Sequence, residues 1–270
     1  MILLYLLVPA VYVVAALIEW GRLAPANEGT SKDPALMSRW LAALALAGHA
    51  VLVDNAVMTP AGFDVSFANA LSAVAGLTAF FAWIGTLARA LPGILAVALP
   101  VAAIGAPLPA LFPNPHEVAF AGEPFALVHI AVALAAFALL IVAALQALVV
   151  LGLQKRLHRG LPEPAGQGMP PLLTLERLLF RMVDIGFVLL TLALVSGALF
   201  SEELFGKPLR FTHKVVFSVL GWLVFGALVF GRYRYGWRGK TALGWVVAGT
   251  GLLVLAYVGS KFVLEVLLRR

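Results

Sequence analysis

Runs of about twenty consecutive apolar residues recur along the whole chain, and they constrain its fold more than any other feature. A helix of about this length crosses the roughly 30 Å hydrocarbon core of a bilayer. The chain is 62% hydrophobic and 12% charged, whereas a soluble domain is about 25% charged because it needs a polar surface. Segments of alternating polarity, typical of membrane barrels, are not visible. The sequence therefore predicts an all-α polytopic membrane bundle.

We expect about eight transmembrane helices, which together form a single transmembrane domain over residues 1–270. The expected spans, in chain order, are 1–20, 38–56, 66–90, 92–111, 123–153, 173–200, 212–231 and 242–266. The fourth span contains Pro100, Pro107 and Pro109, so we expect it to be kinked.

Lysine and arginine are distributed unevenly between the two sets of connections, and this predicts the orientation. One set and its helix ends carry Arg22, Lys32, Arg39, Arg89, Lys155, Arg156, Arg159, Arg177, Arg181, Arg232, Arg234, Arg238 and Lys240. The opposite set carries Lys207, Arg210, Lys214, Lys261, Arg269 and Arg270. By the positive-inside rule the first set faces the cytoplasm, so both termini are expected outside. The net charge of +6 is then a topology signal, and no nucleic-acid partner is expected.

The residue inventory excludes several kinds of chemistry. The chain has no cysteine, which excludes disulfides, cysteine-ligated zinc or iron–sulfur sites and covalent haem attachment. P-loop, HExxH and GxSxG motifs are also missing from the sequence, as are acidic clusters for divalent metals. We therefore expect no catalytic residues and a protein that is not an enzyme.

Two histidines in apolar spans are candidate ligands, because polar side chains are costly inside a membrane. His49 and His129 lie at similar expected depths, about 10 Å below the outer ends of the second and fifth spans. Neutral imidazoles at one depth are suited to axial ligation of a haem iron, here haem b. The alternative is that each histidine hydrogen-bonds a carbonyl or a neighbouring helix. Spacing alone leaves both interpretations open.

Asp184 lies deep in the sixth span, on the same helical stripe as Arg177 and Arg181. An ion pair between Arg181 and Asp184 would neutralise the carboxylate inside the bundle. The alternative is a proton or ion path, which usually needs several polar groups from broken helices. The sequence favours the ion pair.

The C-terminal half of the chain carries a set of short motifs. They are Leu127-Val128-His129-Ile130, Met169-Pro170-Pro171-Leu172-Leu173, Leu175-Glu176-Arg177, Gly186-Phe187, Leu190-Thr191-Leu192, Ser196-Gly197, His213-Lys214, Gly236-Trp237-Arg238-Gly239 and Ala256-Tyr257-Val258-Gly259-Ser260. As a set they resemble the cytochrome c assembly protein family, the CcsA/HemX-like group, and within it the YpjD-type inner-membrane proteins. The resemblance covers nearly the full length and is strongest over residues 123–266.

The resemblance implies haem binding or haem trafficking in the bacterial inner (plasma) membrane, in support of cytochrome c biogenesis. Membrane lipid, haem and cytochrome biogenesis proteins are the expected partners. The family's tryptophan-rich haem-presenting motif is missing between Gly197 and Trp222, which argues against a haem-ligase role. Two other functions remain: a cofactor-free scaffold or regulatory subunit of another membrane protein, and a small transporter.

The resemblance also suggests which residues would bind haem. His129 falls where the family has an external haem-ligating histidine, and either His49 or His213 would be its partner. Arg210 and Lys214 lie near His213 and would suit the haem propionates by charge.

Overall fold

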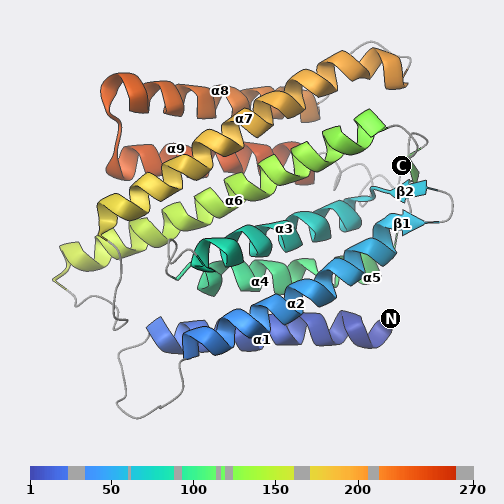
Figure 1. Cartoon of the computed structure of the whole chain (residues 1–270). Coiled ribbons are helices and arrows are strands. Elements are labelled where there is room, and N and C mark those ends of the chain that lie inside the picture. The colour runs from blue at the N-terminus through green and yellow to red at the C-terminus, as the bar shows by residue number, and fades with distance from the viewer. Residues whose placement is uncertain are drawn as a thin grey trace.

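The structure is a computed structural model that describes residues 1–23, 34–59, 62–87, 93–113, 117–118, 124–160, 171–205 and 213–259. Long helices lie side by side across the molecule (Figure 1). The helices are α1 (Ile2–Leu23), α2 (Pro34–Val57), α3 (Phe67–Leu87), α4 (Leu95–Gly105), α5 (Leu108–Leu111), α6 (Pro124–His158), α7 (Leu172–Phe205), α8 (His213–Tyr235), α9 (Gly239–Val254) and a terminal π-helical turn, η1 (Leu255–Gly259).

Seven helices of the described residues are long and apolar enough to cross a membrane, and they confirm the predicted polytopic bundle. These are α1, α2, α3, α6, α7, α8 and α9 with its π-helical continuation. The remaining expected span, at 92–111, is a shorter apolar helical segment, Leu95–Leu111, and it is interrupted near Pro107 as its prolines predicted. It consists of the 11-residue α4, about 16 Å long at 1.5 Å per residue, and the short α5, which begins after Pro107. Pro107 and Pro109 supply no backbone N–H, so the helix cannot continue with its full set of hydrogen bonds.

A small antiparallel sheet joins the ends of α2, α3 and α6, and the sequence did not predict it. Strands β1 (Met58–Thr59), β2 (Gly62–Asp64) and β3 (Glu117–Val118) pair in the order β1-β2-β3. Asp64 accepts a hydrogen bond of 2.9 Å from the Ser66 backbone N–H. Asn69 donates to the carbonyls of Ala56 and Asp64. These bonds fix the turn between α2 and α3.

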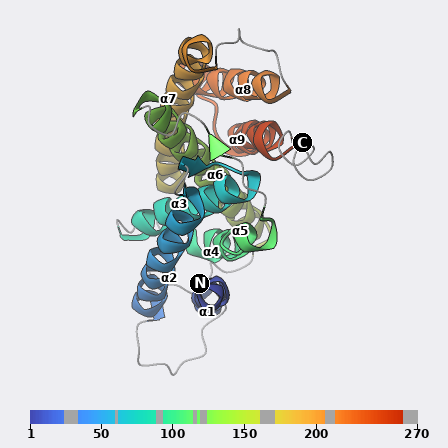
Figure 2. The same cartoon turned by 90° about the vertical axis from the view of Figure 1, so that its right-hand side faces the viewer.

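The interior consists of two alanine-rich cores, one on each side of α6 (Figure 2). Tyr12, Leu52 and Leu99 belong to the first core, between α1, α2, α3 and α4. Phe180, Phe225 and Leu243 belong to the second, between α6, α7, α8 and α9. Small residues let the helices approach closely, as is usual in membrane bundles.

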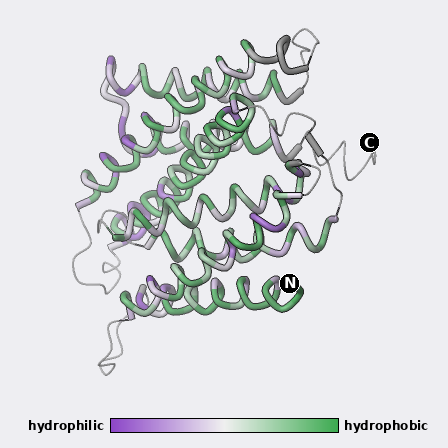
Figure 3. The backbone as a smooth tube through the Cα atoms, turned by 45° about the vertical axis from the view of Figure 1, so that its right-hand side comes forward, coloured by the Kyte–Doolittle hydropathy of each residue, from purple (hydrophilic) through white to green (hydrophobic). Residues whose placement is uncertain are grey.

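One end of the bundle is basic. Arg22, Lys155, Arg156, Arg232 and Arg234 lie in the last turns of α1, α6 and α8. These helix ends lie together at the left of Figure 1, and Figure 3 shows hydrophilic residues at the same end of the bundle. We call it the basic end. The structure thus agrees with the predicted grouping of basic residues; that this end faces the cytoplasm stays a prediction.

Candidate functional site

His49 is enclosed between α1, α2 and α3, with only 1% of its surface exposed. The Tyr12 hydroxyl on α1 lies 3.2 Å from Nδ1 of His49, and the Ser72 hydroxyl on α3 lies 3.0 Å from Nε2. Gly76, one turn after Ser72, lies against the ring. A Cβ atom at Gly76 would be 3.3 Å from Nδ1 and Cε1 of His49. Both ring nitrogens therefore have a hydrogen-bond partner, and the ring is tightly packed.

This packing bears on how well His49 fits a haem. A ligand to iron needs a ring nitrogen whose lone pair is available. His49 would have to release Tyr12 or Ser72 first. In this packing His49 fits the hydrogen-bonding alternative that the sequence left open, and its role as a haem ligand stays a prediction.

His129 has a different environment, on α6 beside α7. It is half-buried, and its Nδ1 lies 2.8 Å from the Ser196 hydroxyl oxygen. That hydroxyl donates to the backbone carbonyl of Ala193 at 3.2 Å. A serine hydroxyl has one hydrogen, so the tautomer of His129 decides whether Ser196 donates to Nδ1 or accepts from it. In the tautomer with hydrogen on Nδ1, the lone pair of the imidazole lies on Nε2, the nitrogen that would ligate iron.

A glycine lies against this ring as well. A Cβ atom at Gly197 would be 3.2 Å from Cε1 of His129 and 3.8 Å from Nε2. Any larger residue at Gly197 would therefore crowd the ligating side of the ring. A half-buried imidazole that contacts a hydroxyl and lies against a glycine is suited to be one ligand of a haem iron.

The structure places His49 and His129 in different helix seams. Helix α3 packs on both α2 and α6 and lies between them (Figure 1). Among the described residues, the hydrogen-bond and ring partners of His49 are Tyr12 and Ser72. The two histidines thus do not touch, and their pairing across one haem stays a prediction.

The structure describes little of the other predicted site residues, which are His213, Lys214 and Arg210. His213 begins α8, but its side chain and that of Lys214 lie outside the described residues, as does the whole of Arg210. His158 lies exposed at the basic end, where its Nδ1 is 3.1 Å from the carbonyl of Gln154. Among the described residues no group of three or more His, Cys, Asp or Glu could hold a metal ion.

The predicted ion pair between Arg181 and Asp184 is wrong. The Asp184 carboxylate accepts a hydrogen bond from the Tyr233 hydroxyl on α8 at 3.0 Å. Arg181 is exposed, and within the described part of the chain the ion pair of Glu19 with Arg22 is the one closer than 4 Å. An exposed arginine gains little from pairing and loses side-chain entropy, whereas a tyrosine on the neighbouring helix reaches the carboxylate directly.

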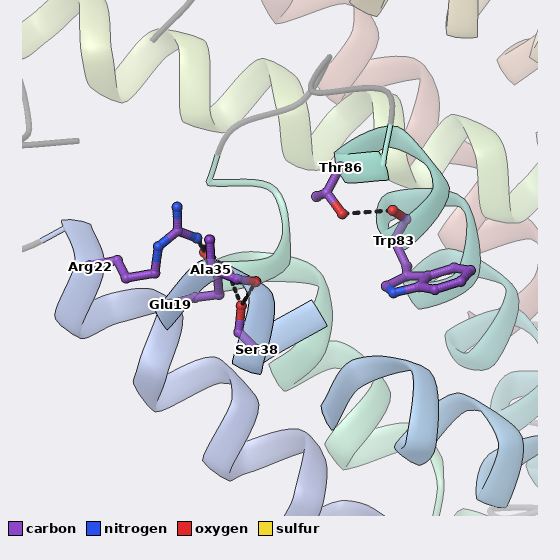
Figure 4. A network of polar contacts seen from close by, with 6 residues as sticks. All are labelled: Glu19, Arg22, Ala35, Ser38, Trp83 and Thr86. Atoms are coloured by element: carbon purple, nitrogen blue, oxygen red, sulfur yellow. Dashed lines mark hydrogen bonds and ion pairs between the residues drawn. The ribbon is translucent and has the colours of Figure 1, made fainter. Parts of the chain in front are cut away.

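The buried carboxylate that does form an ion pair lies at the basic end (Figure 4). Glu19 is 3% exposed, and both its oxygens accept from Nη1 of Arg22 at 2.8 Å. The Ser38 hydroxyl also donates to Glu19. On α3, Thr86 donates to the carbonyl of Trp83, whose indole in turn donates to the carbonyl of Arg39. These bonds tie α1, α2 and α3 together, which is a structural role.

Sequence reasoning missed Tyr12, Ser72 and Ser196, the hydroxyls that hold the two histidines. Ser196 and Gly197 belong to one of the short motifs of the C-terminal half, and this was the available signal. Their function depends on contact with a histidine 67 residues away, which one sequence does not reveal.

Comparison with known proteins identifies the family. The cytochrome C assembly protein family matches residues 26–268. The inner membrane protein YpjD of Escherichia coli (strain K12) is 34% identical over 174 residues, which are 64% of this chain and 65% of that protein. The cytochrome c biogenesis protein CcsA of Synechococcus sp. (strain JA-3-3Ab) is 32% identical over 106 residues, 37% of this chain and 31% of that protein.

The CcsA protein of Prochlorococcus marinus (strain MIT 9303) gives a similar result, with 34% identity over 85 residues, 32% of this chain and 27% of that protein. The matches thus span just under two thirds of YpjD and about a third of the CcsA proteins. No solved structure matches this chain. Since the family match extends over most of the sequence, the chain belongs to the cytochrome c assembly protein family.

Proposed function

We propose that this protein binds or hands on haem in the inner membrane and so assists cytochrome c biogenesis. Family membership supports the inner-membrane location and the role in cytochrome c biogenesis. The likeness to proteins named inner membrane protein YpjD and cytochrome c biogenesis protein CcsA supports them too. The observation that carries the haem proposal is the bond of His129 to Ser196 beside Gly197. We propose haem b as the cofactor, with His129 as an axial ligand.

The roles of the residues follow from their positions. Haem would supply the iron, a flat apolar ring and two carboxylates. His129 offers Nε2 to the iron, and Ser196 fixes the ring by accepting the Nδ1–H. Gly197 keeps the α7 backbone close to the ring without a side chain in the way. These residues bind and orient, and we propose that the protein makes no covalent bond itself, so it is a binding and assembly factor rather than an enzyme.

The second ligand is proposed to be His213 or His49. His213 begins α8, the helix that follows α7 and packs on it. His49 is held by two hydrogen bonds and would have to exchange one of them. Of the two pairs we favour His129 with His213, because both residues lie near helix ends opposite the basic end.

A cofactor-free scaffold is the second candidate function, and one observation favours it. His49, which the sequence marks as a haem ligand, is fully satisfied by Tyr12 and Ser72 and is packed against Gly76. A histidine in this environment acts as a hydrogen-bonded core residue. If His129 acts in the same way, the bundle would stabilise a partner membrane protein without binding a cofactor.

The test is an absorption spectrum of the protein purified in detergent from haem-replete cells, oxidised and then reduced with dithionite. We expect a Soret band with sharp α and β bands on reduction, as bis-imidazole haem gives. His129→Ala should abolish these bands. His213→Ala should weaken them or convert the haem to high spin, and His49→Ala should leave them if the favoured pair is right.

His158→Ala is the matched control, because His158 lies on the same helix at the exposed basic end. It should leave the spectrum unchanged. A protein that stays colourless after haem is added, or bands that survive His129→Ala, would refute the proposal and favour the scaffold.

A further inference from the structure

A cavity of about 360 Å³ lies between α7 and α8 at the basic end. Arg177 and Arg181 from α7 and Arg232 from α8 line it, together with Asp184 and Tyr233. Three arginines and one aspartate therefore line the same cavity, which gives the lining a net positive charge. Such an excess of positive charge in a cavity favours an anionic ligand.

The walls of this cavity are held in place. The guanidinium carbon of Arg232 lies 3.5 Å from the centre of the Phe180 ring, a cation–π contact that orients the charge. The Tyr233 hydroxyl donates to Oδ2 of Asp184 at 3.0 Å. The other carboxylate oxygen, Oδ1, is buried and has no hydrogen-bond partner among the described residues. The Asp184 carboxylate is thus held by Tyr233 and only partly satisfied, which is unusual for a carboxylate with a buried oxygen.

The position of the cavity relative to the membrane follows from the exposed face of α7. Ile185, Val188, Leu192 and Leu199 are each more than half exposed, so they form a stripe that faces lipid tails. Arg177 and Arg181 are exposed too, and at i−8 and i−4 from Ile185 they extend the same stripe.

The depth of the arginines can be counted along the helix. From Arg181 to Leu199 the helix rises about 27 Å at 1.5 Å per residue, close to the roughly 30 Å of hydrocarbon. If Leu199 lies at one boundary of the hydrocarbon, Arg181 lies at the other, where phosphate groups are. Tyr233, 73% exposed, is the residue type that is enriched at this depth.

We propose that this cavity binds the phosphate of an anionic phospholipid headgroup, taken laterally from the leaflet at the basic end. Guanidinium groups bind phosphate oxygens in a bidentate way. The acyl chains would lie along the stripe of Ile185, Val188 and Leu192. A free phosphate would use the same arginines but gain nothing from the apolar stripe.

The experiment uses the full chain in phosphatidylcholine nanodiscs and measures the dissociation constant of a fluorescent phosphatidylglycerol. Each of Arg181→Gln and Arg232→Gln should weaken binding by about tenfold or more, because a charge-assisted hydrogen bond to the phosphate is lost. Arg156→Gln and Arg234→Gln are matched controls, because they lie at the basic end but outside the cavity lining. They should leave the dissociation constant unchanged.

Equal losses of affinity in the cavity and control variants would refute a specific binding site in the cavity. They would show that lipid binding depends on general surface charge. Inorganic phosphate alone, tested as a competitor, should fail to displace the lipid at equal concentration. Displacement would show that the cavity binds free phosphate as well as it binds the lipid headgroup, and would refute the proposal. Should the Gln variants unfold, Arg181→Lys keeps the charge and the fold. It should bind less tightly than wild type because lysine lacks the bidentate geometry, and unchanged affinity would contradict the proposal.

Discussion

The Nδ1 atom of His129 on α6 lies 2.8 Å from the hydroxyl oxygen of Ser196 on α7. The Ser196 hydroxyl also contacts the carbonyl of Ala193 at 3.2 Å, so it links the imidazole ring on α6 to the backbone of α7. His49 in the other half of the bundle differs, since hydroxyls contact both of its nitrogens. The bundle therefore contains one half-buried histidine, His129, and one fully enclosed histidine, His49.

Ser196→Ala is expected to weaken haem binding without removing it. The substitution leaves His129 in place but frees the ring to rotate and to change tautomer. Loss of such an outer hydrogen bond typically costs ten- to a hundredfold in metal affinity, so we expect about a tenfold rise in the haem dissociation constant. Titration of the purified variant with haem measures it. Ser196→Thr keeps the hydroxyl and should restore most of the affinity; unchanged binding in Ser196→Ala would speak against the orienting role.

Tyr12→Phe and Ser72→Ala are expected to destabilise the bundle. Each leaves one nitrogen of the buried His49 without its partner, and such a bond in a membrane protein contributes about 1 kcal/mol. Unfolding in mixed micelles with increasing denaturing detergent gives the free energy of unfolding. The double variant should lose about the sum or slightly less, because both bonds serve one ring. Wild-type stability in both single variants would show that His49 is held by other contacts.

Gly105→Ala is expected to be among the most damaging of small substitutions. A Cβ atom at Gly105 on α4 would overlap the Cβ atom of Ala75 on α3. Neither atom can rotate away because both are fixed to the backbone, so α3 and α4 would have to separate, at about 2–3 kcal/mol. Gly244→Ala on α9 is the control, since nothing lies within 4 Å of its added Cβ, and it should be neutral or slightly stabilising. Equal stability of the two variants would contradict the close packing of α3 on α4.

The orientation can be tested with cysteine labelling, because the chain has no cysteine of its own. Lys240→Cys places a thiol at the exposed start of α9, at the basic end, and Asn55→Cys places one near the other end of α2. If the basic end faces the cytoplasm, a membrane-impermeant maleimide should label Asn55→Cys in intact spheroplasts and Lys240→Cys only after lysis. The reverse pattern would overturn the predicted outward termini.

Much of the fold was predictable, because one physical requirement dominates it. A helix must be long and apolar to cross the membrane, so the seven spanning helices were visible as apolar runs. Their ends differ by a few residues; α6, for example, continues to His158 rather than ending at 153. The segment at 92–111 failed this criterion, since its apolar composition suggested a span while Pro107 shortened the helix.

The site was less predictable, because it depends on contacts between helices. Asp184 accepts from Tyr233, 49 residues later, although Arg181 is much closer in sequence. Likewise, matched depths on two helices suggested a His49–His129 pair, but α3 lies between those helices. Periodicity and depth place a residue along a helix, whereas helix neighbours are set by the packing of all the small residues together.

The most direct test of the central claim is an equilibrium titration of the haem-free protein in detergent with haem, comparing wild type, His129→Ala and His158→Ala. We predict saturable binding of one haem per chain in wild type and in His158→Ala, and a dissociation constant at least about a hundredfold higher in His129→Ala, because loss of an axial ligand removes the iron bond itself. The same affinity in all three proteins, or no saturable binding in wild type, would contradict the claim that this protein handles haem through His129.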